Sequence, residues 1–553
     1  MKVLGVNAVF HDPAAALLVD GVTVAAAEEE RFSRRKHGKP AVAFSTWELP
    51  EQAMRWCLDE AGLAVEDLDA VAYSYDPALA PEPEEAAADE WEALRTLYVR
   101  RAPNFLRTAL PGLDARRVRY VAHHLAHAAS AHMASPHERS AVLVADGRGE
   151  RASLLLAHGR GTAIEPIATQ PLPHSLGLLY EDLTAHLGFH RSSDEYKVMA
   201  LASYGEPRFL DELRRLVTVD GDGGFHVGDV DFERLAPALA PGGTFDSPHA
   251  DLASSVQHRL EEVLLELARL LHERTGERAL TMAGGVALNC VANRRLLAEG
   301  PFDDVWVQPA SGDAGTALGG AMVVAAELGD DVRPLDGADL GRRFSDHQLQ
   351  NLLSVAALAH ERPDDLADEV AGALAAGDVV AWFQGRAELG PRALGHRSLL
   401  ADPRDAANLE RLNDIKGREQ FRPVAPMVLL ERAAEIFDGA IPSPYMLFTH
   451  DVRPEWRDRI PAVVHVDGTA RVQTVDRRRE PLVARMLEAF ERRTGVPVVV
   501  NTSLNTAGRP MVDHPRDALE CFGSAPVDVL ALGPFLVRRA AVVAGAVGER
   551  VAA

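Results

Sequence analysis

The sequence contains few cysteines and no long apolar run. Its 553 residues include only Cys57, Cys290 and Cys521, too few and too scattered for a disulfide scaffold or a CxxC metal site. Such sparse cysteine is typical of a reducing compartment. No apolar run reaches the roughly 18 residues of a membrane-spanning helix, and the opening MKVLGVNAVF has the pattern of a buried strand rather than of a signal peptide. We therefore expect a cytoplasmic protein with no membrane partner.

Positive charge is also scarce. Lysine and arginine number 58 against 81 aspartate and glutamate residues, which gives a formal net charge of -23. This excess repels polyanions, so we expect no nucleic-acid partner, and an anionic substrate would need a local basic pocket. The composition, 47% hydrophobic and 25% charged, is that of a globular protein, and the length predicts two or more domains.

Two stretches share the pattern of a three-stranded meander. The first has apolar strands at 3–8, 14–19 and 22–27, with a hairpin turn at Asp20-Gly21. The second, SAVLVADGRGERASLLLAHGRGTAIEPIA at 140–168, repeats the layout. Two such units in one chain predict a duplicated α/β architecture.

Four histidines lie in VAHHLAHAASAHMASP, residues 121–136. The spacing is helical, so His123 and His127 share one face, whereas His124 and His132 fall on other faces. The glutamate that HExxH zinc proteases use as a base is absent, so peptide hydrolysis is not expected. From the residues alone the pair is either a set of metal ligands or two histidines packed in the core.

Glycine-containing loops follow two further apolar strands. In RALTMAGGVALN, Gly284 and Gly285 stand between a strand and a helix expected near Ala287. The segment VWVQPASGDAGTALGG repeats the pattern, with Asp313 in its loop. A glycine pair at such a junction either lets a ligand approach a helix N-terminus or forms a plain tight turn, and the residues alone leave both open.

Beyond a polar segment at 330–346, which marks a domain boundary, cations gather at the ends of apolar strands. A single arginine there is usually a solvated loop charge, but six cations favour a bound phosphate or carboxylate. Asn501 and Ser503 end a buried strand, where polar side chains need a partner or a ligand. The six cations are Arg386, Arg392, Arg397, Lys416, Arg418 and Arg422.

Nine motifs covering essentially the whole chain occur in an order known from one family. They are FHDPAAALLVDG, AEEERFSRRKHG, HHLAHAAS, ADGRGE, KVMALASYG, AGGVALN, GPRALGHRSLL, RPVAPMVL and VVVNTSLN. On these motifs the chain resembles the O-carbamoyltransferases of the NodU/CmcH family. The resemblance implies an α/β fold: an N-terminal actin-like (ASKHA) domain with duplicated βββ units at 1–345, and a C-terminal YrdC-like α/β domain at 346–553.

The resemblance also implies an ATP-dependent O-carbamoyltransferase. Carbamoyl phosphate and ATP would give carbamoyl-adenylate in the second domain, and the first would carbamoylate a hydroxyl of a natural product, a sugar or antibiotic scaffold. The implied cofactors are ATP, Mg²⁺ accompanying it, and a divalent metal that the family identifies as Fe(II). Two imidazoles with two carboxylates would also suit Zn or Mn. A homodimer is a further expectation.

Individual residues receive roles from the same resemblance. The implied metal ligands are His123, His127, Asp146 and Asp313. The implied catalytic residues are His11, a base that takes the hydroxyl proton, and Lys36, which neutralises phosphate. The implied nucleotide-binding residues are Gly147, Lys197, Gly284, Gly285, Val286 and Asn289. The implied carbamoyl phosphate pocket comprises Arg392, Lys416, Arg422, Arg471, Asn501 and Ser503.

Two other functions compete with this one. A threonylcarbamoyl transferase that modifies tRNA shares the actin-like metal site, but the chain is acidic and lacks a basic stripe. An ATP-binding module of the actin/Hsp70 type would use carboxylates without the histidine pair. Apart from the resemblance, His11 would be a turn residue that caps the hairpin, and Lys36 could equally belong to a solvated basic loop.

Overall fold

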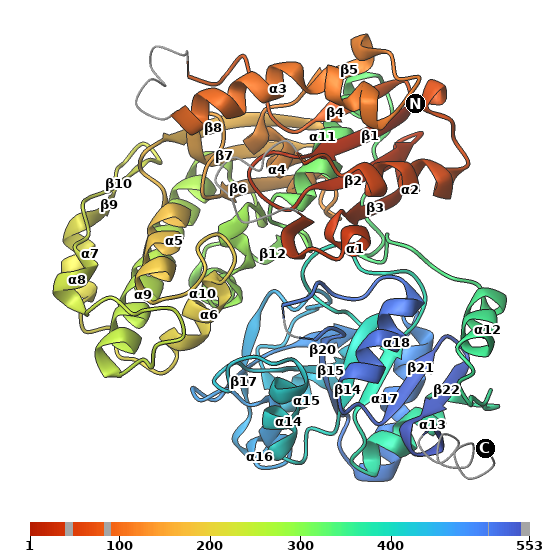
Figure 1. The fold of residues 1–553 in the computed structure, drawn as a ribbon. Helices are drawn as coiled ribbons and strands as arrows, with labels where there is room; N and C mark the ends of the chain where they lie inside the picture. Colours follow the sequence, from red (N-terminus) through yellow and green to blue (C-terminus); the bar gives the residue numbers. More distant parts are fainter. Residues whose placement is uncertain (39–47, 82–89, 507, 543–553) are drawn as a thin grey trace. The chain divides into compact units, whose positions relative to one another are not determined.

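The protein folds into two compact units, Met1–Ala338 and Asp339–Ala553 (Figure 1). The structure is a computed structural model and describes residues 1–38, 48–81, 90–506 and 508–542. Both units mix helices with β-sheets, which confirms the predicted α/β class.

The first unit contains two five-stranded sheets with the same topology. One sheet has the order β3(Val22–Glu28)-β2(Ala14–Val19)-β1(Lys2–Asn7)-β4(Ala70–Tyr73)-β5(Val118–Tyr120). The other has the order β8(Ala163–Pro171)-β7(Ala152–Arg160)-β6(Arg139–Ala145)-β11(Ala279–Ala283)-β12(Asp304–Val307). In each, the first three strands form an antiparallel meander and the last two run parallel to the first. The match confirms the duplicated βββ units and is the arrangement expected of the actin-like domain.

Two helices pack between these sheets. Helix α4(His123–His132) packs on β6, β7 and β11, helix α11(Ala314–Glu327) packs on β1, β2 and β4, and the two helices pack against each other. The close contact between β1 and α11 depends on a glycine. A Cβ atom on Gly5 of β1 would lie 1.8 Å from the carbonyl oxygen of Ala317 in α11. The Ala- and Gly-rich sequence of α11 therefore allows backbone to approach backbone on both sides of the helix.

The remaining elements of the first unit surround this framework. A core that includes Leu4, Val71, Met54 and Leu106 lies between the first sheet and its outer helices. The elements are α1(Glu30–Ser33), η1(Lys36–Gly38), α2(Glu51–Ala61), η3(Val65–Asp67), α3(Glu90–Ala109), η5(Ala115–Arg117), α5(Leu176–His186), α6(Glu195–Ala202), α7(Leu210–Leu216), β9(Val217–Val219), β10(Phe225–Val227), α8(Phe232–Leu235), α9(Ser247–Thr275), η6(Gly285–Leu288) and α10(Cys290–Glu299). The helix expected near Ala287 thus begins at Cys290, after a 3₁₀ turn.

The second unit is built on one mixed sheet of seven strands. Its order is β19(Gln473–Val475)-β15(Ala425–Leu429)-β20(Val498–Ser503)-β14(Arg397–Ala401)-β13(Val380–Phe383)-β21(Val529–Leu532)-β22(Phe535–Arg538). A smaller sheet has the order β16(Phe437–Asp438)-β17(Thr449–Val452)-β18(Thr469–Arg471). The helices are α12(Asp346–Val355), α13(Leu366–Ala375), α14(Ala407–Ile415), α15(Leu430–Ile436), α16(Pro454–Arg457), η7(Pro461–Val463), α17(Pro481–Thr494) and α18(Pro515–Ser524). The strands of the large sheet are almost entirely buried.

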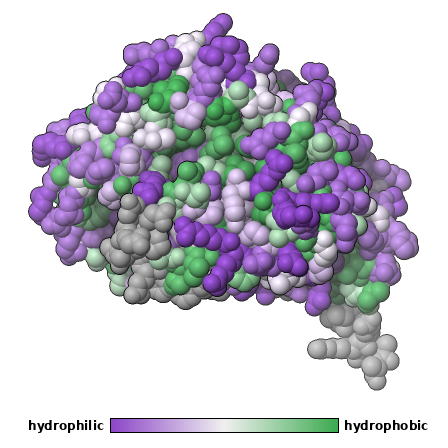
Figure 2. Space-filling model, turned by 90° about the horizontal axis from the view of Figure 1, so that it is seen from above, coloured by the Kyte–Doolittle hydropathy of each residue, from purple (hydrophilic) through white to green (hydrophobic). Residues whose placement is uncertain are grey.

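The face of the molecule seen from above is largely hydrophilic (Figure 2). Figure 2 shows purple side chains over most of the visible face, with smaller green areas between them. Large apolar side chains that are exposed include Leu94, Leu97 and Phe105, all on α3. Among the described residues, none of the helices has both the length and the apolar character needed to cross a membrane.

The packing of α11 on α4 yields a stability prediction. A Cβ atom on Gly319 would lie 1.8 Å from the carbonyl oxygen of Ala126, so Gly319→Ala must push α4 away from α11. We expect the free energy of unfolding to fall by about 1–3 kcal/mol, the usual effect of overpacking a core. Urea unfolding followed by circular dichroism measures the change.

The neighbouring glycine supplies the control. A Cβ atom on Gly320 would come no nearer than 3.7 Å to its closest neighbour, the Cβ of Ala72, which is an ordinary contact. Alanine also favours a helix over glycine by about 1 kcal/mol, so Gly320→Ala should leave the protein as stable or more stable. Equal destabilisation by the two variants would contradict the packing argument.

Candidate metal and anion sites

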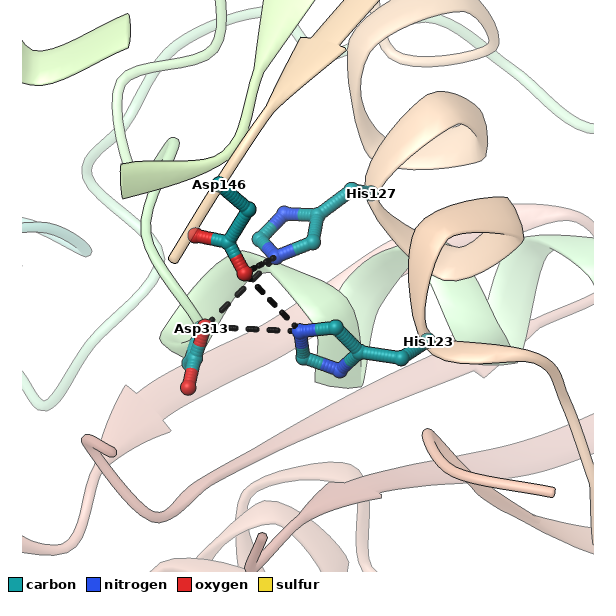
Figure 3. A group of neighbouring side chains, drawn as sticks. All are labelled: His123, His127, Asp146 and Asp313. Atoms are coloured by element: carbon teal, nitrogen blue, oxygen red, sulfur yellow. Dashed lines mark hydrogen bonds and ion pairs between the residues drawn. The ribbon is translucent and has the colours of Figure 1, made fainter. Parts of the chain in front are cut away.

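Two histidines and two aspartates converge in the first unit. Their ligand atoms lie within 4.8 Å of one another, and all four side chains are buried and face one another (Figure 3). His123 opens α4 and His127 lies one turn later, Asp146 directly follows β6, and Asp313 directly precedes α11. His123 Nε2 lies 3.3 Å from Asp146 Oδ2 and 3.6 Å from Asp313 Oδ1, and His127 Nε2 lies 3.7 and 3.5 Å from the same two atoms.

Neighbouring backbone groups orient three of these side chains. His123 Nδ1 donates to the carbonyl oxygen of Ser74 at 3.2 Å, which turns the Nε2 lone pair toward the aspartates. Asp146 Oδ1 accepts from the Gly285 amide at 2.8 Å, and Asp313 Oδ2 accepts from the His11 amide at 3.0 Å. Each carboxylate therefore uses one oxygen to anchor itself and presents the other to the centre of the cluster.

The residues present fit a divalent metal. Both ring nitrogens of His127 are buried and have no hydrogen-bond partner among the described residues, which is costly for a polar group unless something binds there. Ligands that coordinate one ion at about 2.0–2.2 Å with tetrahedral geometry lie roughly 3.3–3.6 Å apart, close to the nitrogen–oxygen separations here. Mixed imidazole and carboxylate ligation suits a first-row transition metal.

Electrostatics in the cluster favour positive charge. Burial acts to lower the pKa of His123, but hydrogen bonding to Asp146 and Asp313 outweighs it and holds that pKa well above its usual value. The pKa of His127 is raised as well, because the nearby carboxylates of Asp146 and Asp313 outweigh the effect of burial. Burial acts to raise the pKa of Asp146, yet the two histidines hold it well below its usual range. The carboxylates thus stabilise a cation between them.

The other two histidines of this helix lie outside the cluster. His124 is buried, and burial lowers its pKa to about 3. His132 pairs its ring nitrogens with Ser140 Oγ and the carbonyl oxygen of Gly161, and burial lowers its pKa to about 4. The helical spacing therefore separated the face that reaches the cluster from the faces that do not.

His11 lies beside the cluster, because its amide is the donor to Asp313. Its Nδ1 lies 2.9 Å from Asp12 Oδ2, and the other oxygen of that carboxylate lies 2.9 Å from His37 Nδ1. Lys36 is exposed, with its Nζ 3.5 Å from Ser193 Oγ. The sequence motifs did not single out Asp12 or His37, although each directly follows a predicted site residue, His11 or Lys36.

The residues expected at the nucleotide vary in their surroundings. Gly284 has φ +93°, and a Cβ there would lie 2.2 Å from the carbonyl oxygen of Ala145, so only glycine fits the turn. Val286 is buried in the 3₁₀ turn that follows. Through Gly285, which donates to Asp146, this turn adjoins the cluster, and so does Gly147, the residue after Asp146.

Lys197 and Asn289 are engaged within the protein. Lys197 Nζ pairs with Asp194 Oδ2 at 3.0 Å. Asn289 caps α10 by accepting from the amide of Ala292, and it exchanges hydrogen bonds with Gln257.

In the second unit, two of the expected anion residues, Lys416 and Ser503, meet at the end of β20. Lys416 is buried, and its Nζ donates to Ser503 Oγ at 2.9 Å and to Asn505 Oδ1. Burial, reinforced by Arg418 and Arg422, holds the pKa of Lys416 well below its usual value, so an anion nearby would favour its charged form.

Three other expected residues of the second unit are less buried. Arg422 pairs with Glu419 at 3.4 Å, Arg471 ends β18, and Arg392 is half-buried in the loop between β13 and β14. Asn501 lies two residues before Ser503 on β20 and is buried.

Two of the six cations have structural contacts instead. Arg397 is fully buried and donates to the carbonyl oxygens of Gln384 and Arg342, and Arg386 donates to those of Leu340 and Gly341. A guanidinium group offers several donors in a fixed plane, so it can hold a loop as well as bind an anion. The sequence pattern does not separate these two uses.

Family models match both units. The carbamoyltransferase N-terminus matches residues 2–110 and 99–322, and the carbamoyltransferase C-terminus matches residues 371–539. The uncharacterized protein sll1178 from Synechocystis is 38% identical over 98% of this chain and 97% of its own length. Nodulation protein NolNO from Sinorhizobium fredii is 40% identical over 96% of this chain and 80% of its own.

Among solved structures, T. kodakarensis HypF is similar at 15% identity and a TM-score of 0.39, covering 59% of this chain and 47% of that one. The family models together span most of both units, and relatives match nearly the whole length of the chain. The chain is therefore a member of the NodU-like carbamoyltransferase family and a carbamoyl-transferring enzyme.

Proposed function

We propose that the protein is an ATP-dependent O-carbamoyltransferase that divides its reaction between two sites. The observation that carries the proposal is the buried cluster of His123, His127, Asp146 and Asp313, in the unit that matches the carbamoyltransferase N-terminus. The cationic position around Lys416, in the unit that matches the C-terminus, would bind carbamoyl phosphate.

The first half-reaction would take place in the second unit. Water cleaves carbamoyl phosphate to carbamate and phosphate, and a carbamate oxygen then attacks the α-phosphorus of ATP and displaces pyrophosphate. The product, carbamoyl-adenylate, is a better acyl donor than carbamate, because carbamate is an anion without a good leaving group. Lys416, Arg422 and Arg471 would neutralise the phosphate oxygens.

The second half-reaction would take place at the cluster. An acceptor hydroxyl oxygen attacks the carbamoyl carbon, the bond to AMP breaks with its electron pair on the phosphate oxygen, and His11 takes the hydroxyl proton. Asp12 supports this role, because a carboxylate that accepts from Nδ1 assigns the proton there and gives Nε2 the basic lone pair. Lys36 would neutralise phosphate at the rim.

A divalent metal bound by the four ligands, Fe(II) by analogy with the family, would supply Lewis acidity and a template for phosphate oxygens. Mg²⁺ would accompany ATP. The glycine turn from Gly284 to Val286, with Gly147, would lie against the nucleotide, and Lys197 and Asn289 would shape its surroundings. The acceptor would be a hydroxyl of a natural product, a sugar or antibiotic scaffold.

Metal content should depend on His127. His127→Gln removes one imidazole from the centre of the cluster, and elemental analysis of purified protein should fall from about one metal per chain to well below half that value. His132→Gln is the control, because that histidine lies on the same helix and bonds only away from the cluster. Full metal occupancy in the His127 variant would refute the assignment.

The nucleotide products should be AMP and pyrophosphate. An adenylate intermediate requires attack at the α-phosphorus, whereas a kinase-like or chaperone-like use of the fold gives ADP and phosphate. Chromatography of a reaction with carbamoyl phosphate and ATP separates the two outcomes. ADP and phosphate as the only products would favour the ATP-binding module instead.

Mutations should separate the two half-reactions. Lys416→Ala removes charge that holds carbamoyl phosphate, so adenylate formation should fall about 10- to 150-fold while transfer from added carbamoyl-adenylate is retained. His11→Asn should have the opposite effect, because it removes the base and keeps a short polar side chain. If both folded variants lost both half-reactions equally, two separate sites would be the wrong description.

A further inference from the structure

We infer that Gln473 fixes which end of the Asn501 amide faces the carbamoyl phosphate pocket, and so makes the pocket selective for the NH₂ of a carbamoyl group. The inference rests on the proposed function, which assigns Asn501 to that pocket. Gln473 is a positioning residue, since its contacts are with Asn501 and with the backbone.

The orientation of the Gln473 amide follows from a backbone contact. Its Nε2 donates to the carbonyl oxygen of Leu394 at 2.7 Å, and a carbonyl oxygen can only accept. Its Oε1 must therefore face the other way, where it accepts from Asn501 Nδ2 at 2.6 Å. The carbonyl oxygen of Ala393 accepts from the same nitrogen at 3.1 Å. These two oxygens, with Met427 Sδ at 3.8 Å as a third acceptor, hold Asn501 Nδ2 on the protein side.

The other end of the Asn501 amide is left as an acceptor. Asn501 is 1% exposed, and its Oδ1 has no hydrogen-bond partner among the described residues. A buried amide oxygen is normally satisfied, and since none of the described residues donates to this one, it is available to accept from a bound ligand. An NH₂ group can supply that donor, whereas a methyl group or an anionic oxygen cannot.

Strand register brings this oxygen to the cationic position. Asn501 and Ser503 are two residues apart on β20 and therefore point to the same face of the sheet, and Ser503 Oγ accepts from Lys416 Nζ at 2.9 Å. Strand β15 lies between β19, which carries Gln473, and β20, which carries Asn501. Met427 of β15 pairs with Gln473 on one side and with Val499 of β20 on the other, so the Gln473 side chain contacts Asn501 across β15. Neighbouring groups would thus bind the phosphate and read the amide of one ligand.

Acetyl phosphate is the probe that isolates the amide contact, because it replaces NH₂ by CH₃ and keeps the phosphate. We expect the unaltered protein to bind carbamoyl phosphate at least tenfold more tightly than acetyl phosphate in calorimetric titrations. In Gln473→Met, which fills similar space without the amide oxygen, Asn501 Nδ2 loses its shortest acceptor and keeps only the carbonyl oxygen of Ala393 and the sulfur of Met427, so the Asn501 amide is held less firmly in this orientation. The preference should then fall about tenfold, with the affinity for inorganic phosphate changed less than twofold.

Gln384→Met is the matched control, because that glutamine is also buried in the second unit and its amide donates only to the carbonyl oxygens of Ala531 and Gly533. It should keep the preference. Asn501→Leu, a near-isosteric change, removes the acceptor itself and should abolish the preference even if Gln473→Met does not fold.

Two results would overturn the inference. One is an unaltered protein that binds acetyl and carbamoyl phosphate equally, and the other is a set of variants in which all three ligands weaken together. The proposed function is judged separately, by pyrophosphate release: selective binding without pyrophosphate would refute the adenylation step and leave the role of Gln473 intact.

Discussion

The contact between α4 and α11 determines where the chemistry of the first unit can occur. Each helix belongs to one of the two duplicated sheets, and at Gly319 their backbones approach so closely that a methyl group would not fit. This approach brings the first turn of α4, with His123 and His127, to the residue that precedes α11, Asp313. Duplication supplies two equivalent frameworks, and their close packing brings side chains from both into one cluster.

Backbone groups rather than further side chains orient three of the residues in that cluster. Asp146 and Asp313 each accept one main-chain amide, and His123 donates to one main-chain carbonyl. Main-chain partners cannot be lost through a side-chain substitution, so the geometry depends on the path of three loops. Main-chain groups play the same part in the second unit. Glu388 accepts from the amides of Leu394, His396 and Arg397, and the loop that it shapes contacts Asn501.

Much of the fold could be predicted from the sequence because its signals are local. The Asp20-Gly21 turn and the alternation around it define a hairpin, and the spacing of His123 and His127 defines a helix face. Which arginine binds a ligand could not be predicted, since Arg397 and Arg392 lie in the same loop motif and only the carbonyls around Arg397 identify its structural use. Asp12, His37 and Gln473 were missed because their importance depends on partners distant in the sequence.

The hydrogen bond from the His11 amide to Asp313 has a consequence for motion. It ties the β1–β2 turn to a carboxylate whose other oxygen faces the cluster, so the turn and the cluster are mechanically coupled. Thermodynamic linkage makes such coupling reciprocal: whatever steadies Asp313 also orders the turn, and whatever displaces the turn loosens the cluster. Phe10, whose ring packs edge-on against His123 with centroids 5.1 Å apart, adds a second tether in the same turn. From these two contacts we expect His11 and the cluster to become ordered together.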